Sequence, residues 1–308
     1  MKKRLKNLLY RNNFIKSVIE FITGELFNAG IPFEIKKMRI LARSDYFRER
    51  MVKKYNKIAK PDLHVLESPI FHPAKPKEEV CDELRKSAFS SGFFLSESSV
   101  EKILEFCRTA KFKVNGNAKH TTKISVDDDI PISFGNHFSV TDAHLKCEEV
   151  MNLCRDPFIL GVATKYLGQH PQLLRTDLWW NYPEVGDSSS GNNQFGFHYD
   201  LADYKCVKLF AYLSDVDESA GPHVIINGTH KSRTFFEKLN RRITDEQSLE
   251  IYGEESIEHF YGQKGTAFFS DPFAYHKGDE PKSRRLIFQI CYSVSNIYRD
   301  CAKNSLNY

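Results

Sequence analysis

The chain has 308 residues, 41% of them hydrophobic and 13% aromatic, which suffices for one large β-rich domain with a helical extension or for two small domains. Its formal net charge of +4 is too weakly basic to predict a nucleic-acid partner. The seven cysteines are odd in number and lack a Cys-x-x-Cys pair, which argues against a disulfide framework or cysteine zinc site and favours a reducing, cytoplasmic location. No apolar run approaches the ~20 residues of a membrane span, and no apolar core of a secretion signal follows the basic start.

Residues 1–57 are predicted to be helical and amphipathic, because apolar residues recur there at helical spacing between charges. A basic helix on a membrane surface or protein partner fits this pattern, and so does the more common helix packed on its own domain. The three prolines of 69–76 predict an extended linker. We therefore divide the chain into a helical extension with linker, 1–77, and a second domain, 78–308.

The first part of the second domain is predicted to be mainly helical. Helices over 79–89 and 96–109 flank a short strand at 92–95, and Ser98 with Glu101 fits a capping box. Residues 111–142 are polar and are expected to be irregular, with Asp127-Asp128-Asp129 a solvated loop rather than a metal site. Residues 143–167 are predicted to be helical, divided near Asp156-Pro157 and closed by Gly168.

After Gly168, short runs rich in aromatic and β-branched residues alternate with turn residues. They predict strands over 173–182, 194–198, 206–214, 223–227, 266–270 and 286–295, with a helical insertion over 235–252. Short antiparallel strands after a helical first half predict a mainly β fold. Its core is expected to be a double-stranded β-helix, or jelly roll, flanked by helices.

The strongest candidate site combines His198-Tyr199-Asp200 with His276, which follows His198 by 78 residues. Alternate residues of a strand share a face, so His198 and Asp200 are expected to point into one cavity and Tyr199 away from it. Two histidines and one carboxylate form the facial triad of non-haem Fe(II) oxygenases, which leaves positions for a co-substrate and O2. For the triplet alone, a hydrogen-bonded structural pair is the more common explanation. Arg285 opens a predicted strand nine residues after His276, and its guanidinium can hold a dicarboxylate.

Three further stretches resemble the phytanoyl-CoA dioxygenase family. The segment from Ala220-Gly221-Pro222 to Thr229-His230-Lys231 is similar to the family's "NGPL-x-x-x-PGSH-K" stretch, with Asn227 and Thr229 in place of Pro and Ser. Gly92-Phe93-Phe94, and Asp156-Pro157-Phe158 to Tyr166-Leu167-Gly168, look like the family's helical first half. The resemblance covers roughly residues 80–295.

This resemblance implies an enzyme that uses Fe(II), 2-oxoglutarate and O2 to hydroxylate an unactivated carbon, with formation of succinate and CO2. On the family pattern His198, Asp200 and His276 match the iron ligands. Arg285 matches the arginine that binds the distal carboxylate of 2-oxoglutarate. Arg284 is the rival, but Arg285 has the family's usual offset of seven residues from an aromatic, Tyr292. Because Asp200 is present where halogenating relatives have a small residue, the resemblance implies hydroxylation.

Several other side chains have alternative interpretations. Trp179 and Asn181 share one face of their predicted strand and Trp180 the other, so one tryptophan is expected in the core, and Asn181 is a candidate 2-oxoglutarate contact. Lys208 lies inside a β-run, which predicts either an anion nearby or an edge strand. The polar insertion 186–193 is typical of a mobile lid. His230 is expected to be a turn residue, and surface or loop positions are expected for His120, His137 and His144.

The resulting hypothesis is a hydroxylase of a small metabolite or biosynthetic intermediate, with no nucleic-acid partner. A membrane or protein contact through the basic N-terminal helix is compatible with it, and the sequence sets no oligomeric state. One alternative is a jelly-roll protein that binds metal or ligand without turnover. Another is a zinc hydrolase that uses the same three ligands.

Overall fold

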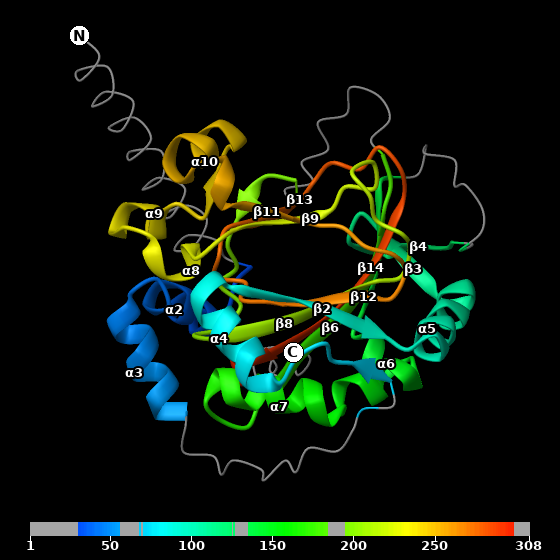
Figure 1. Ribbon diagram of the computed structural model, residues 1–308, viewed down its shortest axis with the longest axis horizontal. Helices are drawn as coiled ribbons and strands as arrows, with labels where there is room; N and C mark the ends of the chain where they lie inside the picture. Colours follow the sequence, from blue (N-terminus) through cyan, green and yellow to red (C-terminus); the bar gives the residue numbers. More distant parts are fainter. Residues whose placement is uncertain are drawn as a thin grey trace.

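The computed structural model describes residues 30–55, 68, 70–124, 126, 135–183 and 195–298. These residues form two antiparallel β-sheets that face each other, with helices packed around them (Figure 1). The larger sheet has nine strands in the order β1-β2-β12-β8-β14-β6-β5-β3-β4, and the smaller has five in the order β10-β7-β13-β9-β11. The prediction of a mainly β jelly roll flanked by helices is confirmed.

The elements have the following bounds. The larger sheet contains β1 (Phe71–His72), β2 (Phe89–Leu95), β3 (Lys111–Val114), β4 (Asn117–Lys123), β5 (His137–Thr141), β6 (Gln172–Asn181), β8 (Cys206–Tyr212), β12 (Thr266–Ser270) and β14 (Arg285–Ser293). The smaller sheet contains β7 (Phe197–His198), β9 (His223–Ile226), β10 (Arg242–Ile243), β11 (Ile257–Phe260) and β13 (His276–Gly278). The helices are α2 (Phe33–Leu41), α3 (Asp45–Tyr55), α4 (Lys77–Ser87), α5 (Glu97–Thr109), η3 (Ala143–Leu145), α6 (Glu148–Cys154), α7 (Pro157–Leu167), α8 (Thr229–Ser232), α9 (Phe235–Leu239), α10 (Asp245–Tyr252) and η4 (Glu254–Ser256).

Strands β8 and β14 form the centre of the larger sheet, and every residue of both is buried. One face of this sheet is covered by α4 and α7, and the other faces the smaller sheet (Figure 1). Burial on both faces explains why these strands are near-continuous runs of apolar residues rather than alternating ones. The space between the two sheets is where side chains from both can meet.

The helix boundaries at α7 follow the predicted pattern. The Asp156 carboxylate accepts hydrogen bonds from the backbone N–H groups of Phe158 and Ile159, which caps the helix before Pro157. Gly168 ends the helix with a φ of +82°, a conformation that glycine adopts without a Cβ clash. Local capping chemistry therefore determines where this helix lies.

Parts of the described chain before residue 78 belong to the core of the molecule. Ile35, Met38 and Ala42 of α2 are buried in the main core. Phe71 of β1 stacks on Phe93 and Phe158, with ring centroids 5.6 and 5.7 Å apart. Residues 1–29, which carry most of the predicted amphipathic helix, lie outside the described residues. The domain division at 77/78 stays a prediction.

Three expectations for local structure were wrong. Residues 111–142 contain β3, β4 and β5 instead of irregular chain. The alternation of apolar and polar residues that predicts a strand is missing from β4, because it is a polar, largely exposed edge strand. The cap of α5 is Ser96, whose side chain accepts from the Ser99 N–H, rather than Ser98. The insertion 235–252 is interrupted by β10, which pairs with β7. The Asp127-Asp128-Asp129 triplet and the polar insertion 186–193 lie outside the described residues.

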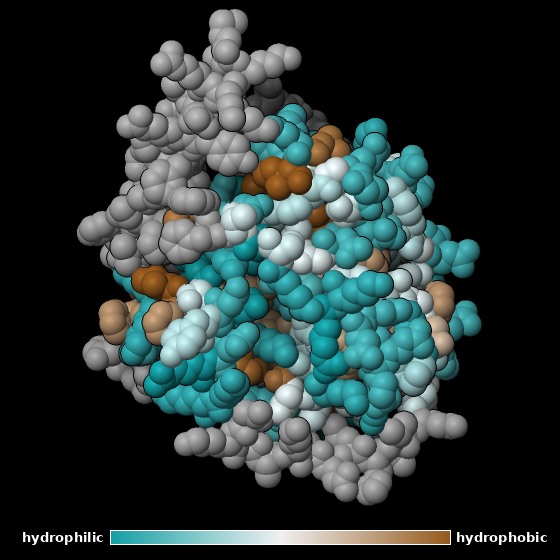
Figure 2. Space-filling view, turned by 60° about the vertical axis from the view of Figure 1, so that its left-hand side comes forward, coloured by the Kyte–Doolittle hydropathy of each residue, from teal (hydrophilic) through white to brown (hydrophobic). Residues whose placement is uncertain are grey.

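The exterior is mostly polar. The face shown in Figure 2 is largely hydrophilic, with small, separated hydrophobic patches. Exposed apolar side chains such as Phe33, Phe47, Leu249 and Ile251 lie on helices, and scattered exposure of this kind is normal for folded proteins. Within the described residues, no helix combines the length and apolarity needed to cross a bilayer.

Candidate active site

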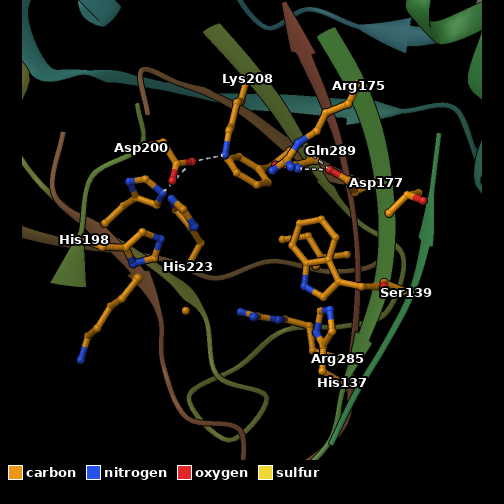
Figure 3. A pocket seen from close by; sticks show the side chains of 17 residues that line it. His137, Ser139, Arg175, Asp177, His198, Asp200, Lys208, His223, Arg285 and Gln289 are labelled. Atoms are coloured by element: carbon orange, nitrogen blue, oxygen red, sulfur yellow. Dashed lines mark hydrogen bonds and ion pairs between the residues drawn. The ribbon is translucent and has the colours of Figure 1, made fainter. Parts of the chain in front are cut away.

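A cavity of about 270 Å³ lies between the two sheets (Figure 3). Strands β5, β6, β8 and β14 of the larger sheet contribute one part of its lining, and β7, β9 and β13 of the smaller sheet contribute another. The predicted residues His198, Asp200, His276 and Arg285 all line this cavity. The structure therefore brings residues that are far apart in the chain into one space.

His198, Asp200 and His276 form a compact group of donor atoms. His276 on β13 is the register partner of His198 on β7, and their ring centroids are 4.6 Å apart. One ligand atom from each of the three side chains lies within 4.8 Å of the other two. The separation of 78 residues between the histidines is thus bridged by strand pairing.

The chain around Asp200 has the predicted alternation. The Asp200 N–H donates to the Pro272 carbonyl at 2.8 Å, just after β7 ends. Tyr199 points away from the cavity and is buried, with its ring 5.6 Å from that of Tyr275. His198 and Asp200 consequently share the cavity face, as expected from a strand.

Both histidines have their Nδ1 atoms held by the backbone. His198 Nδ1 lies 2.9 Å from the Gly196 carbonyl oxygen, and His276 Nδ1 lies 2.9 Å from that of Ala274. Because a carbonyl oxygen only accepts, each Nδ1 carries the proton and each Nε2 keeps its lone pair. Burial lowers the pKa of both rings, that of His276 to about 3 with help from His198. Both imidazoles are therefore neutral near pH 7, the form that binds metals.

Lys208 is the cationic neighbour of Asp200. Its Nζ lies 2.7 Å from Asp200 Oδ2, and the lysine side chain is only 5% exposed. Burial by itself raises the pKa of Asp200, but the neighbouring charge of Lys208 opposes this effect and holds the pKa well below its usual value. Strand β8 lies between β12 and β14, so the edge-strand explanation for Lys208 was wrong. The alternative of a nearby anion is confirmed, and the anion is Asp200.

Arg285 is buried at another wall of the cavity. It donates to the Gly221 carbonyl, and its Nη2 donates to Asn181 Oδ1 at 3.2 Å. Gly221 has a φ of +70°, and a Cβ there would meet the Asp279 carbonyl oxygen at 2.4 Å, so this turn requires glycine. Asn181 is the register partner of Arg285 and orients it. Arg284 instead lies over the ring of Trp180, which is buried in the core as one of the two tryptophans was expected to be.

Three cavity-lining side chains have a buried nitrogen with no hydrogen-bond partner among the described residues: Trp179 Nε1, His223 Nε2 and Arg285 Nε. Buried polar groups are almost always paired in folded proteins. The three residues line one cavity, but each of these nitrogens is itself inaccessible to solvent. The His223 ring lies 5.5 Å from that of His276 and 4.8 Å from that of Phe210.

A polar group that the sequence analysis did not identify lies across the cavity from the histidines (Figure 3). Asp177 Oδ2 accepts from Gln289 Nε2 at 2.5 Å and pairs with Arg175 Nε at 2.9 Å. Arg175, Asp177 and Trp179 are alternate residues of β6 and share its cavity face. The shared face of these three residues could have been predicted from their alternate positions in the sequence. Only the register with β14 places Gln289 beside them.

The structure also shows where the four histidines lie that were expected in turns, in loops or at the surface. His120 is exposed, as expected. His137 and His144 were wrongly expected at the surface or in loops. His137 lies on β5 and lines the cavity, where burial lowers its pKa to about 4. His144 is buried, with Nδ1 2.9 Å from Thr176 Oγ1. His230 lies in α8, with its Nε2 3.2 Å from the Arg85 carbonyl oxygen.

The fold and the grouped donors define the class of this protein, a jelly roll with two histidines and one carboxylate at its cavity. The sequence profile of the phytanoyl-CoA dioxygenase (PhyH) family matches residues 78–286, and the chain belongs to that family. The family predicted from the sequence is confirmed. A comparison with curated proteins returned no match.

Several solved structures are similar to this chain. The structure of EctD from S. alaskensis with 2-oxoglutarate and 5-hydroxyectoine is 16% identical over 77% of this chain and 81% of that one, with a TM-score of 0.49. HygX from Streptomyces hygroscopicus with nickel and 2-oxoglutarate bound is 14% identical over 70% and 86%, with a TM-score of 0.48. The α-ketoglutarate-dependent epimerase SnoN from nogalamycin biosynthesis is 16% identical over 70% and 80%, with a TM-score of 0.47.

Proposed function

We propose that this protein is an Fe(II)- and 2-oxoglutarate-dependent dioxygenase that hydroxylates a C–H bond of a small molecule. The observation that carries the proposal is the donor group of His198, Asp200 and His276, whose ligand atoms lie within 4.8 Å of one another beside a buried arginine. Membership of the phytanoyl-CoA dioxygenase family supports the same reaction class.

The three donors fit a divalent iron ion. Two neutral imidazoles with free Nε2 lone pairs and one ionised carboxylate are the ligand set of non-haem Fe(II) sites. His198 and His276 are held through Nδ1, so their Nε2 atoms can bind without losing another partner. Iron bound there together with 2-oxoglutarate would supply the activation of O2 and the oxidation of the substrate carbon.

Arg285 fits the distal carboxylate of 2-oxoglutarate. Its guanidinium is buried and is oriented by Asn181 and Gly221, and the side chain lines the cavity. A buried and oriented guanidinium favours the binding of an anion that accepts two hydrogen bonds. Asn181 would act on the co-substrate through Arg285, because its amide oxygen accepts from that side chain.

The remaining cavity residues would prepare the site. Lys208 keeps Asp200 ionised before a metal binds. Phe210, Ile287 and the ring of Trp179 provide apolar walls that displace water from the reacting carbon. Asp177 and Gln289 present fixed polar atoms on the far wall that can orient a substrate hydroxyl or amine.

Succinate release from 2-oxoglutarate tests this function without knowledge of the substrate. The wild-type protein with Fe(II) and O2 is expected to form succinate slowly, and His198→Ala to form none. Mn(II) binding under anaerobic conditions, measured by calorimetry, gives a second criterion that needs no turnover. Metal and 2-oxoglutarate binding without any succinate would instead favour a non-catalytic binding protein, and an O2-independent hydrolysis would favour the zinc hydrolase.

A further inference from the structure

The turn of residues 271–275 joins the two sheets directly before His276. Strand β12 of the larger sheet precedes this turn, and β13 of the smaller sheet begins at His276. Within the turn, the Asp271 carboxylate accepts from the Phe273 N–H at 2.9 Å, and the Ala274 N–H donates to the Asp271 carbonyl at 3.1 Å. Asp271 therefore fixes the shape of the turn through both its side chain and its backbone.

Two carbonyl groups of the same turn hold two of the predicted metal ligands. The Pro272 carbonyl accepts from the Asp200 N–H at 2.8 Å, and the Ala274 carbonyl oxygen lies 2.9 Å from His276 Nδ1. The first contact fixes the backbone of Asp200, and the second fixes the ring orientation and tautomer of His276. The positions of both ligands therefore depend on the conformation of one turn.

Tyr166, near the end of α7, holds the turn through Asp271. Its hydroxyl donates to Asp271 Oδ2, while Asp271 Oδ1 accepts from the Phe273 N–H. Burial, followed by the charge of Asp271, raises the pKa of Tyr166 well above its usual value, so the hydroxyl keeps the proton that it donates. Because both residues are buried, water does not compete for this hydrogen bond.

We propose that Asp271 and Tyr166 are positioning residues of the metal site, which hold Asp200 and His276 in the geometry that a metal ion requires. This role rests on the proposed dioxygenase function, because that function assigns a metal to these ligands. Neither Asp271 nor Tyr166 lines the cavity, so both act through the turn rather than on a bound molecule. Loss of a group that orients a metal ligand typically costs roughly 10–100-fold in metal affinity.

Mn(II) binding to the full-length protein, measured by anaerobic calorimetry, tests this role. Tyr166→Phe removes only the hydroxyl, and Asp271→Ala removes both hydrogen bonds of the carboxylate. Each variant is expected to bind Mn(II) roughly tenfold more weakly than the wild type, the lower end of the effect of losing an orienting group. Asp271→Asn should restore most of the affinity, because its amide oxygen can accept from the Phe273 N–H and its amide nitrogen can donate to the Tyr166 oxygen. An Asp271→Asn protein as weak as Asp271→Ala would contradict the proposal.

Tyr292→Phe is the matched control for the loss of a buried tyrosine hydroxyl. Tyr292 belongs to the same core as Tyr166, and its hydroxyl donates to the Cys154 carbonyl at 2.7 Å, away from the turn. Both variants should lose similar stability in urea, but Tyr292→Phe should bind Mn(II) like the wild type. Unchanged Mn(II) affinity in Tyr166→Phe, or equal weakening in the two variants, would overturn the proposal.

Hydrogen exchange of the Asp200 amide in the metal-free protein, measured by NMR, tests the turn without a metal. Because the Asp200 N–H is bonded to the Pro272 carbonyl, a loosened turn exposes it to water. We expect exchange roughly tenfold faster in Tyr166→Phe than in Tyr292→Phe, the effect of about one lost hydrogen bond to a charged group. Equal rates in the two variants would refute the role of Tyr166. Failure of the metal site would appear separately, as wild-type protein that binds no Mn(II), while a difference in exchange would still support the positioning of Asp200.

Discussion

Lys208 Nζ lies 2.7 Å from Asp200 Oδ2. Strand β8, at the centre of the larger sheet, therefore places a buried cation beside the carboxylate that is grouped with His198 and His276. Asp200 is 23% exposed and Lys208 5%. Removing one partner of a buried pair leaves an uncompensated charge, which destabilises a protein far more than loss of a surface pair.

Lys208→Met is therefore expected to lower the free energy of unfolding of the metal-free protein by about 2 kcal/mol, less than the ~3–5 kcal/mol of a fully buried pair because Asp200 keeps some solvent. Urea unfolding at pH 7 measures the difference. Mn(II) should restore part of the loss, since a cation bound by Asp200 replaces the ammonium charge. Lys264→Met, which breaks an exposed pair with Glu101, is the control and should cost less than about 1 kcal/mol. Equal losses in the two variants would refute the role of Lys208.

Arg285→Gln is expected to weaken 2-oxoglutarate binding to the Mn(II)-loaded protein by roughly ten- to a hundredfold, because about 1.5–3 kcal/mol of charge-assisted hydrogen bonding is lost. Anaerobic calorimetry measures the affinity. Arg284→Gln changes the neighbouring arginine, which lies over Trp180, and should leave the affinity unchanged. If Arg284→Gln weakens 2-oxoglutarate binding and Arg285→Gln does not, Arg284 is the arginine that binds the co-substrate.

Gly278→Ala tests the position of the Arg285 guanidinium without changing its charge. A Cβ at residue 278 would lie 2.9 Å from Arg285 Nη2, so the guanidinium must move. We expect weaker 2-oxoglutarate binding with Mn(II) affinity retained, both by calorimetry. Gly196→Ala, where an added Cβ meets nothing within 4 Å, is the matched control. Unchanged affinity in Gly278→Ala would show that the arginine position is not critical.

His137 predicts a pH dependence of stability. Burial lowers its pKa from 6.5 to about 4, so between these values the unfolded chain holds more of this proton than the folded protein. The contribution of His137 to stability is therefore fully present above pH 6.5 and lost as the pH falls towards 4. The free energy of unfolding, measured by urea unfolding at several pH values across this window, should change less with pH in His137→Gln than in the wild type. An identical pH dependence in the two proteins would mean that His137 titrates in the folded protein as it does in the unfolded chain.

The sequence by itself determined the local features of this protein. The spacing of His198 and Asp200 places both side chains on one strand face through a geometric period of two. Asp156 and Gly168 mark the ends of a helix through capping chemistry that involves only neighbouring residues. The His–Asp–His–Arg order and the stretch around Gly221 were enough to identify the family, because the types and order of these residues can be read without knowing which of them meet in space.

Only the tertiary structure decided which distant residues meet. The register of β13 against β7 sets His276 opposite His198, and the central place of β8 turns Lys208 into the partner of Asp200. Arg39 reaches the hydroxyl of Tyr298, 259 residues away in the chain, because α2 packs its apolar face into the core. Strand register and helix docking depend on the packing of side chains across the whole molecule, and no local pattern contains that information.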